Sequence, residues 1–130
     1  MTDAERLRIA WLVRGSLALL FAYHGLVPKL LWLSTDEVRM ISAHGWANAA
    51  PIAYAAGLAE LLWAALLLIF RQARWPLLVS AVLLLGLLLD VLWFAPDLLR
   101  QAFNPFSTNM LGLALCLIGW WVSAPRLAAD

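Results

Sequence analysis

Four long apolar stretches constrain the fold of this chain more than any other feature of its sequence. They cover about residues 9–27, 50–70, 75–95 and 108–123, and the segments between them carry nearly all of the proline, asparagine, serine and charge. A helix of about 20 apolar residues crosses the hydrocarbon core of a bilayer. We therefore predict an all-α membrane protein, an antiparallel four-transmembrane-helix bundle that forms a single domain over residues 1–130.

Composition excludes several other classes of protein. Hydrophobic residues make up 65% of the 130 residues, against about 45–50% in a typical soluble domain. Charged residues make up 13% and the net charge is +1, so we expect no nucleic-acid partner. Four spans leave only short connections, too short for a soluble catalytic domain. The lone cysteine, Cys116, excludes an intrachain disulfide and a CxxC thiol relay.

Lysine and arginine predict the orientation of the chain. One side of the predicted membrane holds Arg6, Arg8, Arg71, Arg74 and Arg126, and the other holds Lys29, Arg39 and Arg100. The positive-inside rule then places both termini in the cytoplasm, with the bundle in the cell (inner) membrane. Tryptophans near both predicted boundaries agree with an aromatic belt: Trp11, Trp75, Trp120 and Trp121 on the inner side, and Trp32, Trp46 and Trp93 on the outer side.

The two outer loops carry helix signals of their own. Ser34 and Glu37 have the spacing of a capping box, and Gly45 is placed to end the helix that they begin. In the second outer loop Pro96 can open a helical turn and Pro105 must end one. We therefore predict a short interfacial helix in each outer loop. Residues 71–74 form only a tight turn.

Small residues on one helix face mark the predicted contacts between spans, because they let membrane helices approach closely. In the fourth span this face holds Asn109, Gly112, Cys116, Gly119 and Ser123. In the third span Leu83, Gly86 and Asp90 share one face, which we expect to point inward.

Two ionisable residues of the predicted spans lie on faces with small residues, and Glu60 is the one at the centre of its span. Arg14 shares a helix face with Gly25, and Glu60 shares one with Gly57. A charge at the centre of a membrane helix costs about 2.5–3.5 kcal/mol or more unless it finds a partner. We therefore predict a buried structural ion pair between Arg14 and Glu60.

Several polar residues fall at similar depth in the outer half of the spans. They are His24, Lys29, Glu60, Asp90, Asn104 and Asn109. Together they predict a ligand pocket in which Lys29 supplies positive charge, His24 a titratable donor and the asparagines hydrogen bonds. Such a pocket suits a quinone-like or small anionic ligand. Because the histidines lack the spacing of helical metal sites, we predict no metal site.

Several segments give the chain a family resemblance. They are Arg14 in the first span, residues 24–30 (HGLVPKL), Glu37, residues 57–60 (GLAE) and residues 103–109 (FNPFSTN). With these motifs the chain resembles the DoxX-like family of small four-span membrane proteins. The family's namesake is a subunit of a membrane thiosulfate:quinone oxidoreductase, so the resemblance implies an accessory subunit of a membrane oxidoreductase, with quinone as a ligand and a soluble oxidoreductase subunit as a partner.

Alternative functions remain open at this point. The chain carries neither a cysteine pair nor a soluble cofactor domain, so we do not expect it to be catalytic alone. A non-catalytic assembly or lipid-binding module is the main alternative, in which buried charges only fix the register of the helices. Self-association into a homo-oligomer fits either function. A small-solute carrier ranks last, because the two predicted hairpins lack matching sequence and inverted topology.

Overall fold

The computed structural model describes residues 1–123, and in this part of the chain the regular secondary structure is entirely helical. Its long helices are α1 (Asp3–Gly25), α3 (Ala49–Ile69), α4 (Trp75–Phe94) and α5 (Pro105–Val122), and its short ones are η1 (Leu26–Leu31), α2 (Thr35–Ala43) and η2 (Pro96–Arg100). Four segments are long and apolar enough to cross a membrane: α1 together with η1, then α3, α4 and α5. The prediction of four membrane-spanning helices is confirmed.

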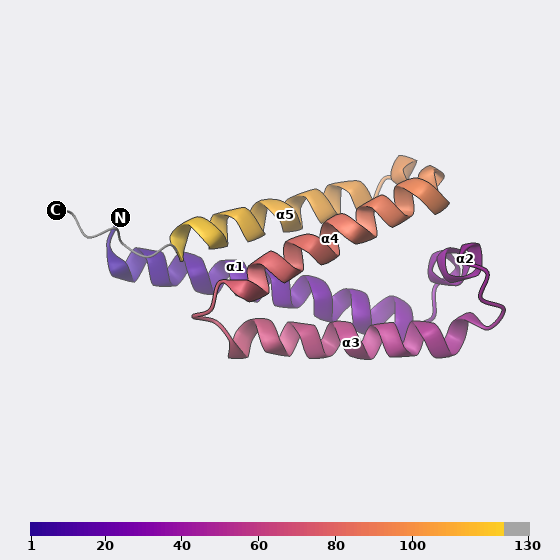
Figure 1. Cartoon of the computed structure of the whole chain (residues 1–130), viewed down its shortest axis with the longest axis horizontal. Coiled ribbons are helices and arrows are strands. Elements are labelled where there is room, and N and C mark those ends of the chain that lie inside the picture. Colours follow the sequence, from indigo (N-terminus) through magenta and orange to yellow (C-terminus); the bar gives the residue numbers. More distant parts are fainter. Residues whose placement is uncertain (124–130) are drawn as a thin grey trace.

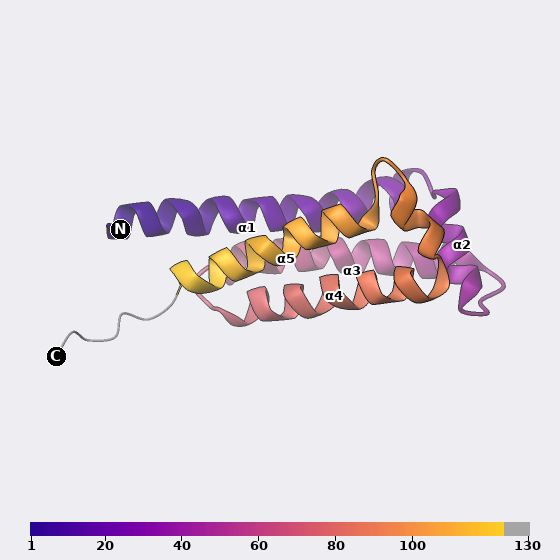
Figure 2. The same ribbon diagram turned by 90° about the horizontal axis from the view of Figure 1, so that it is seen from above.

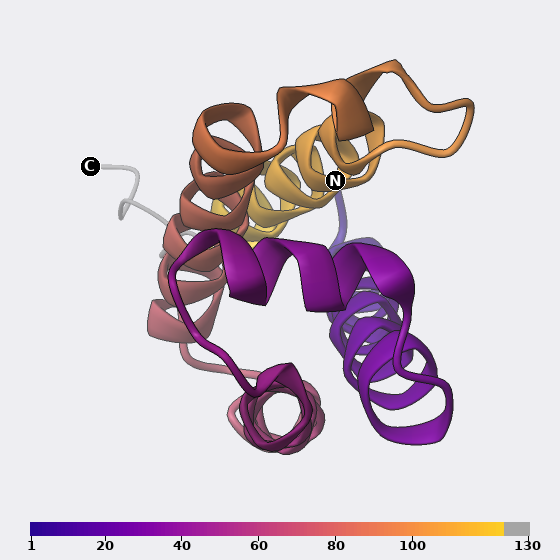
Figure 3. The same ribbon diagram turned by 90° about the vertical axis from the view of Figure 1, so that its right-hand side faces the viewer.

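Successive long helices run in alternating directions (Figures 1 and 2). Helix α1 packs against α3 and α5, and α4 packs mainly against α5. We call the end that carries the N-terminus and the turn at residues 71–74 the inner end, and the end that carries α2 and η2 the outer end. At the outer end, α2 lies across the ends of the long helices (Figure 3).

The core lies between α1 and the other three long helices. Its centre is a cluster of buried side chains from all four: Val13, Leu17, Ala18, Phe21, Ala64, Leu67, Leu77, Leu84 and Cys116. Other leucines and valines of the same helices, such as Leu12, Leu62 and Val82, are exposed. A chain that leaves so much apolar surface uncovered is suited to lipid rather than to water.

Glycines bring α1 and α3 into backbone contact near the outer end. A Cβ atom added to Gly25 would lie 2.6 Å from the carbonyl oxygen of Gly57, and one added to Gly57 would lie 2.7 Å from the carbonyl oxygen of Gly25. No larger residue fits at either position without moving the backbones apart. This contact fixes how far α1 is shifted along α3.

The first span is longer than its apolar pattern predicts. Pro28 lacks the N–H that an α-helix needs, yet the helix continues to Leu31 as a π-helical segment. The N–H of Trp32 donates to the carbonyl of Val27 at 3.0 Å, five residues earlier. The wider turn accommodates the proline and carries Lys29 inward, where it is buried.

Both outer loops contain the short helices that their sequence signals predict. In the first loop the Ser34 hydroxyl accepts from the backbone N–H of Glu37 at 3.2 Å, and Gly45 has a φ of +86° just after the end of α2. The capping box is only half formed, because the Glu37 carboxylate contacts Lys29 instead of reaching back to Ser34. Helix η2 begins at Pro96 in the second loop, but it ends at Arg100, and Pro105 opens α5 instead of ending the loop helix as predicted.

The predicted helix faces have mixed outcomes. In α5, Asn109, Gly112, Cys116 and Gly119 are buried as expected. In α4 the prediction is wrong, because Leu83 and Gly86 are exposed and the buried face carries Ser80 and Leu84. The Ser80 hydroxyl accepts from the Trp63 indole N–H at 3.0 Å, so a polar group that sequence analysis passed over helps to orient α4 against α3.

Candidate functional site

A cavity of about 490 Å³ opens at the outer end of the molecule. Helices α1, η1, α2, α3, α4, η2 and α5 all contribute side chains to its wall. The six polar residues predicted for the pocket all line it: His24, Lys29, Glu60, Asp90, Asn104 and Asn109. Sequence analysis missed other polar lining residues, namely Asp36, Glu37, His44, Gln101 and Thr108.

Lys29 is held by three acceptors. Its Nζ lies 3.0 Å from Oε1 of Glu37 and 3.2 Å from Oε2 of Glu60, and it donates to the carbonyl oxygen of His24 at 3.2 Å. That carbonyl is available because Pro28, four residues later, has no N–H to donate to it. An ammonium group has three donors, so the protein itself occupies all of them. The positive charge predicted for an anionic ligand is therefore already neutralised.

The predicted ion pair between Arg14 and Glu60 is wrong. Glu60 lies beside Gly25 and binds Lys29, whereas the Arg14 guanidinium donates from Nη2 to the backbone carbonyl of Ala73 near the inner end. Arg14 precedes Gly25 by about three helical turns, which is about 16 Å along the axis. An arginine side chain cannot cover that distance. Two charged residues therefore do not pair merely because each shares a helix face with small residues.

His44 joins the end of α2 to α4. Its Nε2 lies 2.8 Å from Oδ1 of Asp90 and its Nδ1 lies 2.7 Å from the carbonyl oxygen of Met40, while its ring packs on Phe94 at 4.1 Å between centroids. Both neighbours of the ring nitrogens are acceptors, so only the doubly protonated imidazolium can donate to both. The hydrogen bond to Met40, and then the one to Asp90, raise the pKa of His44.

The two asparagines at the cavity have different roles. Asn104 caps α5, since its Oδ1 accepts from the backbone N–H of Ser107 at 2.9 Å and its Nδ2 donates to the carbonyl of Gln101 at 3.1 Å. Asn109 is only 6% exposed, and its side chain makes no hydrogen bond within residues 1–123. The ring of His24 likewise has no hydrogen-bond partner in the described part of the chain. These are the two of the six residues whose side chains make no hydrogen bond within the described part of the chain.

The charge of the cavity is mainly negative. Four carboxylates line it, from Asp36, Glu37, Glu60 and Asp90, against one lysine and two histidines. Apolar side chains complete the wall: Met40, Ile41, Ile52, Leu87, Val91 and Leu98. Within residues 1–123, no cluster of three or more His, Cys, Asp or Glu side chains is arranged to hold a metal ion. The arrangement suits an uncharged molecule with an apolar body and polar oxygens better than a free anion.

Comparison with known proteins identifies a family and no individual relative. A model of the DoxX-like family matches residues 18–117, a segment that contains all six predicted pocket residues. No curated protein and no solved structure shows a significant match to the chain. The match covers most of the sequence and confirms the resemblance drawn from the motifs at residues 24–30 and 103–109.

Proposed function

This chain belongs to the DoxX-like family, and on that premise we propose that it is a membrane subunit whose outer-end cavity binds the headgroup of a quinone-like molecule. The family match and the four apolar helices make it a multi-pass membrane protein.

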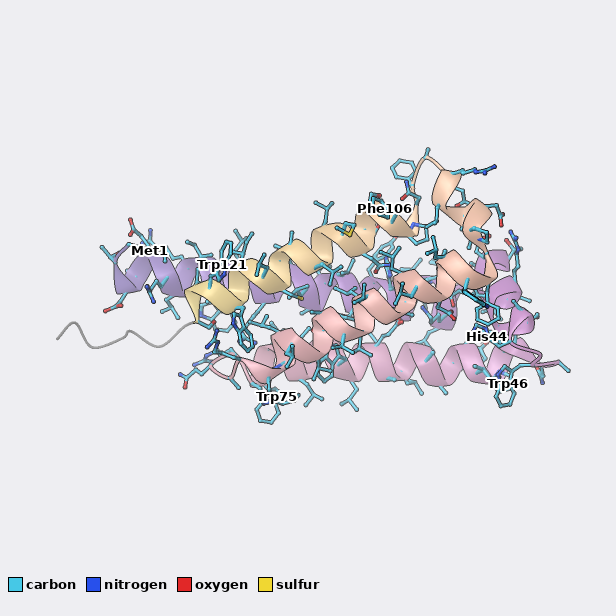
Figure 4. All side chains as sticks on the ribbon, turned by 45° about the horizontal axis from the view of Figure 1, so that its top comes forward. Met1, His44, Trp46, Trp75, Phe106 and Trp121 are labelled. Carbon is cyan, nitrogen blue, oxygen red and sulfur yellow. The ribbon has the colours of Figure 1, made fainter. Side chains whose placement is uncertain are left out.

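We place the chain in the cell inner membrane as an antiparallel bundle, with α2 and η2 at the outer interface and both termini in the cytoplasm. Tryptophans at both ends support a bundle that reaches two interfaces, because Trp75 and Trp121 lie towards the end of Met1 whereas Trp46 lies at the opposite end (Figure 4). The excess of arginine at the end of Met1 supports the orientation. Arg126, one of the residues counted in the charge bias, lies outside the described residues.

A labelling experiment tests the orientation. Single cysteines at Asp3 and Ser42, in a Cys116→Ala background, report on the two ends separately. An impermeant thiol reagent applied from outside the cell should label only the cysteine at position 42. Labelling only at position 3 would reverse the orientation.

The proposal of a ligand rests mainly on the side chain of Asn109, which has no hydrogen-bond partner within residues 1–123. Asn109 is 6% exposed and borders a cavity of about 490 Å³, so its amide is available to a molecule in that cavity. Cavities of about 300–1,000 Å³ with mostly apolar walls and a few polar groups are typical of small-molecule sites. A carbonyl oxygen of a ligand would satisfy the amide.

Charge favours the uncharged ligand over the anionic one. Lys29 is neutralised by Glu37 and Glu60, and Asp36 and Asp90 add further negative charge to the wall. A small anion entering the cavity would meet repulsion without a free cation to offset it. A quinone headgroup is uncharged, and its apolar tail can leave between the helices into lipid.

Each polar residue then has a defined task. The Asn109 amide and the His24 imidazole donate hydrogen bonds to ligand oxygens, while Lys29 holds Glu60 in place. Asp90 and His44, which are about one third exposed, exchange protons with the outer aqueous side. A bound quinone takes up electrons and protons in equal number, the electrons coming from a soluble oxidoreductase subunit. We therefore assign this chain a binding role and no catalysis of its own.

Mass spectrometry of co-purifying small molecules tests the ligand. Protein purified in mild detergent should retain a quinone, and both Asn109→Leu and His24→Leu should lose it while remaining folded. Cys116→Ala is the matched control, because Cys116 lies on the same buried face of α5 outside the cavity wall. Retention of the quinone by both cavity variants, or no quinone in the parent protein, would refute the proposal.

A non-catalytic assembly or lipid-binding module is the second candidate, and one observation favours it. Lys29 ties η1 to α2 through Glu37 and to α3 through Glu60, which is what a purely structural charge network does. In that case the protein contains no quinone, and Lys29 variants fail to assemble, whether with a partner or as a homo-oligomer. The mass-spectrometry experiment separates the two candidates.

A further inference from the structure

A second cavity lies at the opposite end of the molecule, and the proposed function makes no use of it. It has a volume of about 210 Å³ and lies between the inner part of α1 and the turn that joins α3 to α4. Its wall consists of Leu7, Ala10, Trp11, Arg14, Arg71 and Gln72. Arg14 therefore lines a separate cavity, far from Glu60, the residue with which the sequence predicted it to pair.

The Arg14 guanidinium is buried without a counter-charge. The residue is 1% exposed, its Nη2 donates to the carbonyl of Ala73, and its Nη1 is buried with no hydrogen-bond partner within residues 1–123. A guanidinium keeps its proton and can only donate. Within the same residues Arg14 forms no salt bridge, so a residue that lines the cavity carries a positive charge without a counter-charge and an N–H without a partner.

Arg71 brings a second guanidinium to this cavity. It lies over the ring of Trp11, with 5.1 Å from Cζ to the ring centroid, and both side chains are exposed and free to move aside. Gln72 adds an amide, whereas no Asp or Glu among residues 1–123 lines the wall. The acidic residues in the first turn of α1, Asp3 and Glu5, lie outside it. In the described part of the chain the cavity thus combines two cations with an amide donor and no acid.

We propose that this cavity binds a phosphate group, that of an anionic phospholipid in the adjacent leaflet. The planar guanidinium matches the spacing of phosphate oxygens, and Arg is preferred over Lys for this reason. Trp11 beside the cavity, with Trp75 and Trp121 towards the same end, sets its depth at the level of the headgroups (Figure 4). Leu7 and Ala10 offer an apolar surface to the rest of the lipid.

Arg74 provides a matched control at the same turn. Its guanidinium lies 3.8 Å from the centroid of the Trp120 ring and donates to the Trp120 carbonyl at 3.2 Å. It does not line the cavity. Loss of Arg74 removes the same charge from the same end of the molecule as loss of Arg71, and it leaves the proposed site intact.

The experiment counts lipids bound to the purified protein by native mass spectrometry, with phosphatidylglycerol and phosphatidylcholine of identical acyl chains offered together. The parent protein should retain phosphatidylglycerol selectively. Arg71→Gln should weaken this binding about tenfold, the effect of losing one charge-assisted contact, and Arg74→Gln should not change it. Arg14→Met should also abolish retention. Because Arg71 is exposed, its variant keeps the test decisive even if the Arg14 variant does not fold.

Competition with inorganic phosphate identifies the source of the phosphate group. Retention of phosphatidylglycerol in millimolar phosphate supports the lipid, whereas displacement of the lipid by phosphate supports the same site with free phosphate as its ligand. Equal retention of the two lipids by the parent protein, or equal losses in Arg71→Gln and Arg74→Gln, would overturn the proposal. None of these outcomes depends on a ligand in the outer cavity.

Discussion

At the outer end of the molecule Lys29 contacts two carboxylates, whereas at the inner end Arg14 contacts a backbone carbonyl and, within the described residues, no carboxylate. The same contrast extends to the neighbouring charges. Arg39 pairs with both oxygens of Asp97 at 2.6 and 2.7 Å near the outer end. At the inner end Arg74 packs on an indole ring.

This difference separates two ways of stabilising a charge near a membrane. At the outer end Lys29 is paired with Glu37 and Glu60, and these contacts hold α2 over the long helices. At the inner end, within residues 1–123, the Arg14 guanidinium keeps an N–H without a partner, and the arginines contact backbone carbonyls and aromatic rings. Substitutions of the paired charges Lys29, Glu37 and Glu60 at the outer end should therefore affect folding, and substitutions of Arg71 at the inner end should affect what the protein binds.

The largest expected effect is the loss of Lys29. Lys29→Met leaves Glu37 and Glu60 without their cation, and removing one partner of a buried ion pair typically costs about 3–5 kcal/mol of unfolding free energy. Adding Glu60→Leu to Lys29→Met should recover much of this loss, because the remaining carboxylate of Glu37 is 26% exposed and can reach water. Reversible unfolding in detergent micelles measures both.

The matched control for this cycle is Arg14→Met combined with Glu60→Leu. Arg14 contacts Ala73 near the inner end, whereas Glu60, on α3, lies beside Gly25 at the outer end, so the two side chains do not touch and their effects should add within about 0.5 kcal/mol. If the free-energy changes of Lys29→Met and Glu60→Leu simply add, or if those of Arg14→Met and Glu60→Leu are strongly coupled, then the paired cation is not at the outer end as described.

A smaller effect is expected at the glycine contact that aligns α1 with α3. Gly25→Ala forces a methyl group against the carbonyl of Gly57, and overpacking of this kind costs about 1–3 kcal/mol. Gly86→Ala is the control, since a Cβ there meets nothing within 4 Å and alanine is the better helix former. Thermal unfolding of the two variants measures the difference. If the two variants unfold at the same temperature, the close approach of α1 to α3 is not needed to hold Lys29 beside Glu60.

The sequence predicts the fold well because span length and capping are local properties. The apolar runs locate all four long helices, and Ser34 and Gly45 mark both ends of α2. Pro28 is misleading, since a π-helical turn carries the chain past it. The inward face of α4 is also wrong: Leu83 and Gly86 match a small-residue pattern, but packing against α5 buries Leu84 instead.

For the outer cavity, the polarity of a residue predicts that its side chain lines the wall, but it does not predict which charged residues pair with one another. A polar residue within an apolar span must face the interior, and for this reason all six predicted residues line one cavity. Which charges meet depends on the axial shift between helices, and the contact between Gly25 and Gly57 sets that shift. Helical periodicity gives the direction of Arg14 and Glu60 but contains no information on this shift. Glu37 shows a related failure, because a cap and an ion pair compete for the same carboxylate.

The smallest expected effect is a pH dependence confined to the outer end. The hydrogen bond from His44 to the Met40 carbonyl, and then the one to Asp90, raise the pKa of His44. A raised pKa in the folded state means that protonation stabilises the fold. This contribution is complete below the pKa of about 6.5 expected for the unfolded chain, and it is lost as the pH rises through the higher pKa of the folded chain. The unfolding temperature in detergent should therefore fall as the pH rises from about 5.5 to about 8. Asp90→Asn should weaken the fall without abolishing it, because the Met40 carbonyl remains, and His44→Gln should remove it. If the unfolding temperature of His44→Gln falls with pH as steeply as that of the parent protein, the titrating group lies elsewhere. His44 and Asp90 would then not be a charge pair that stabilises the outer end.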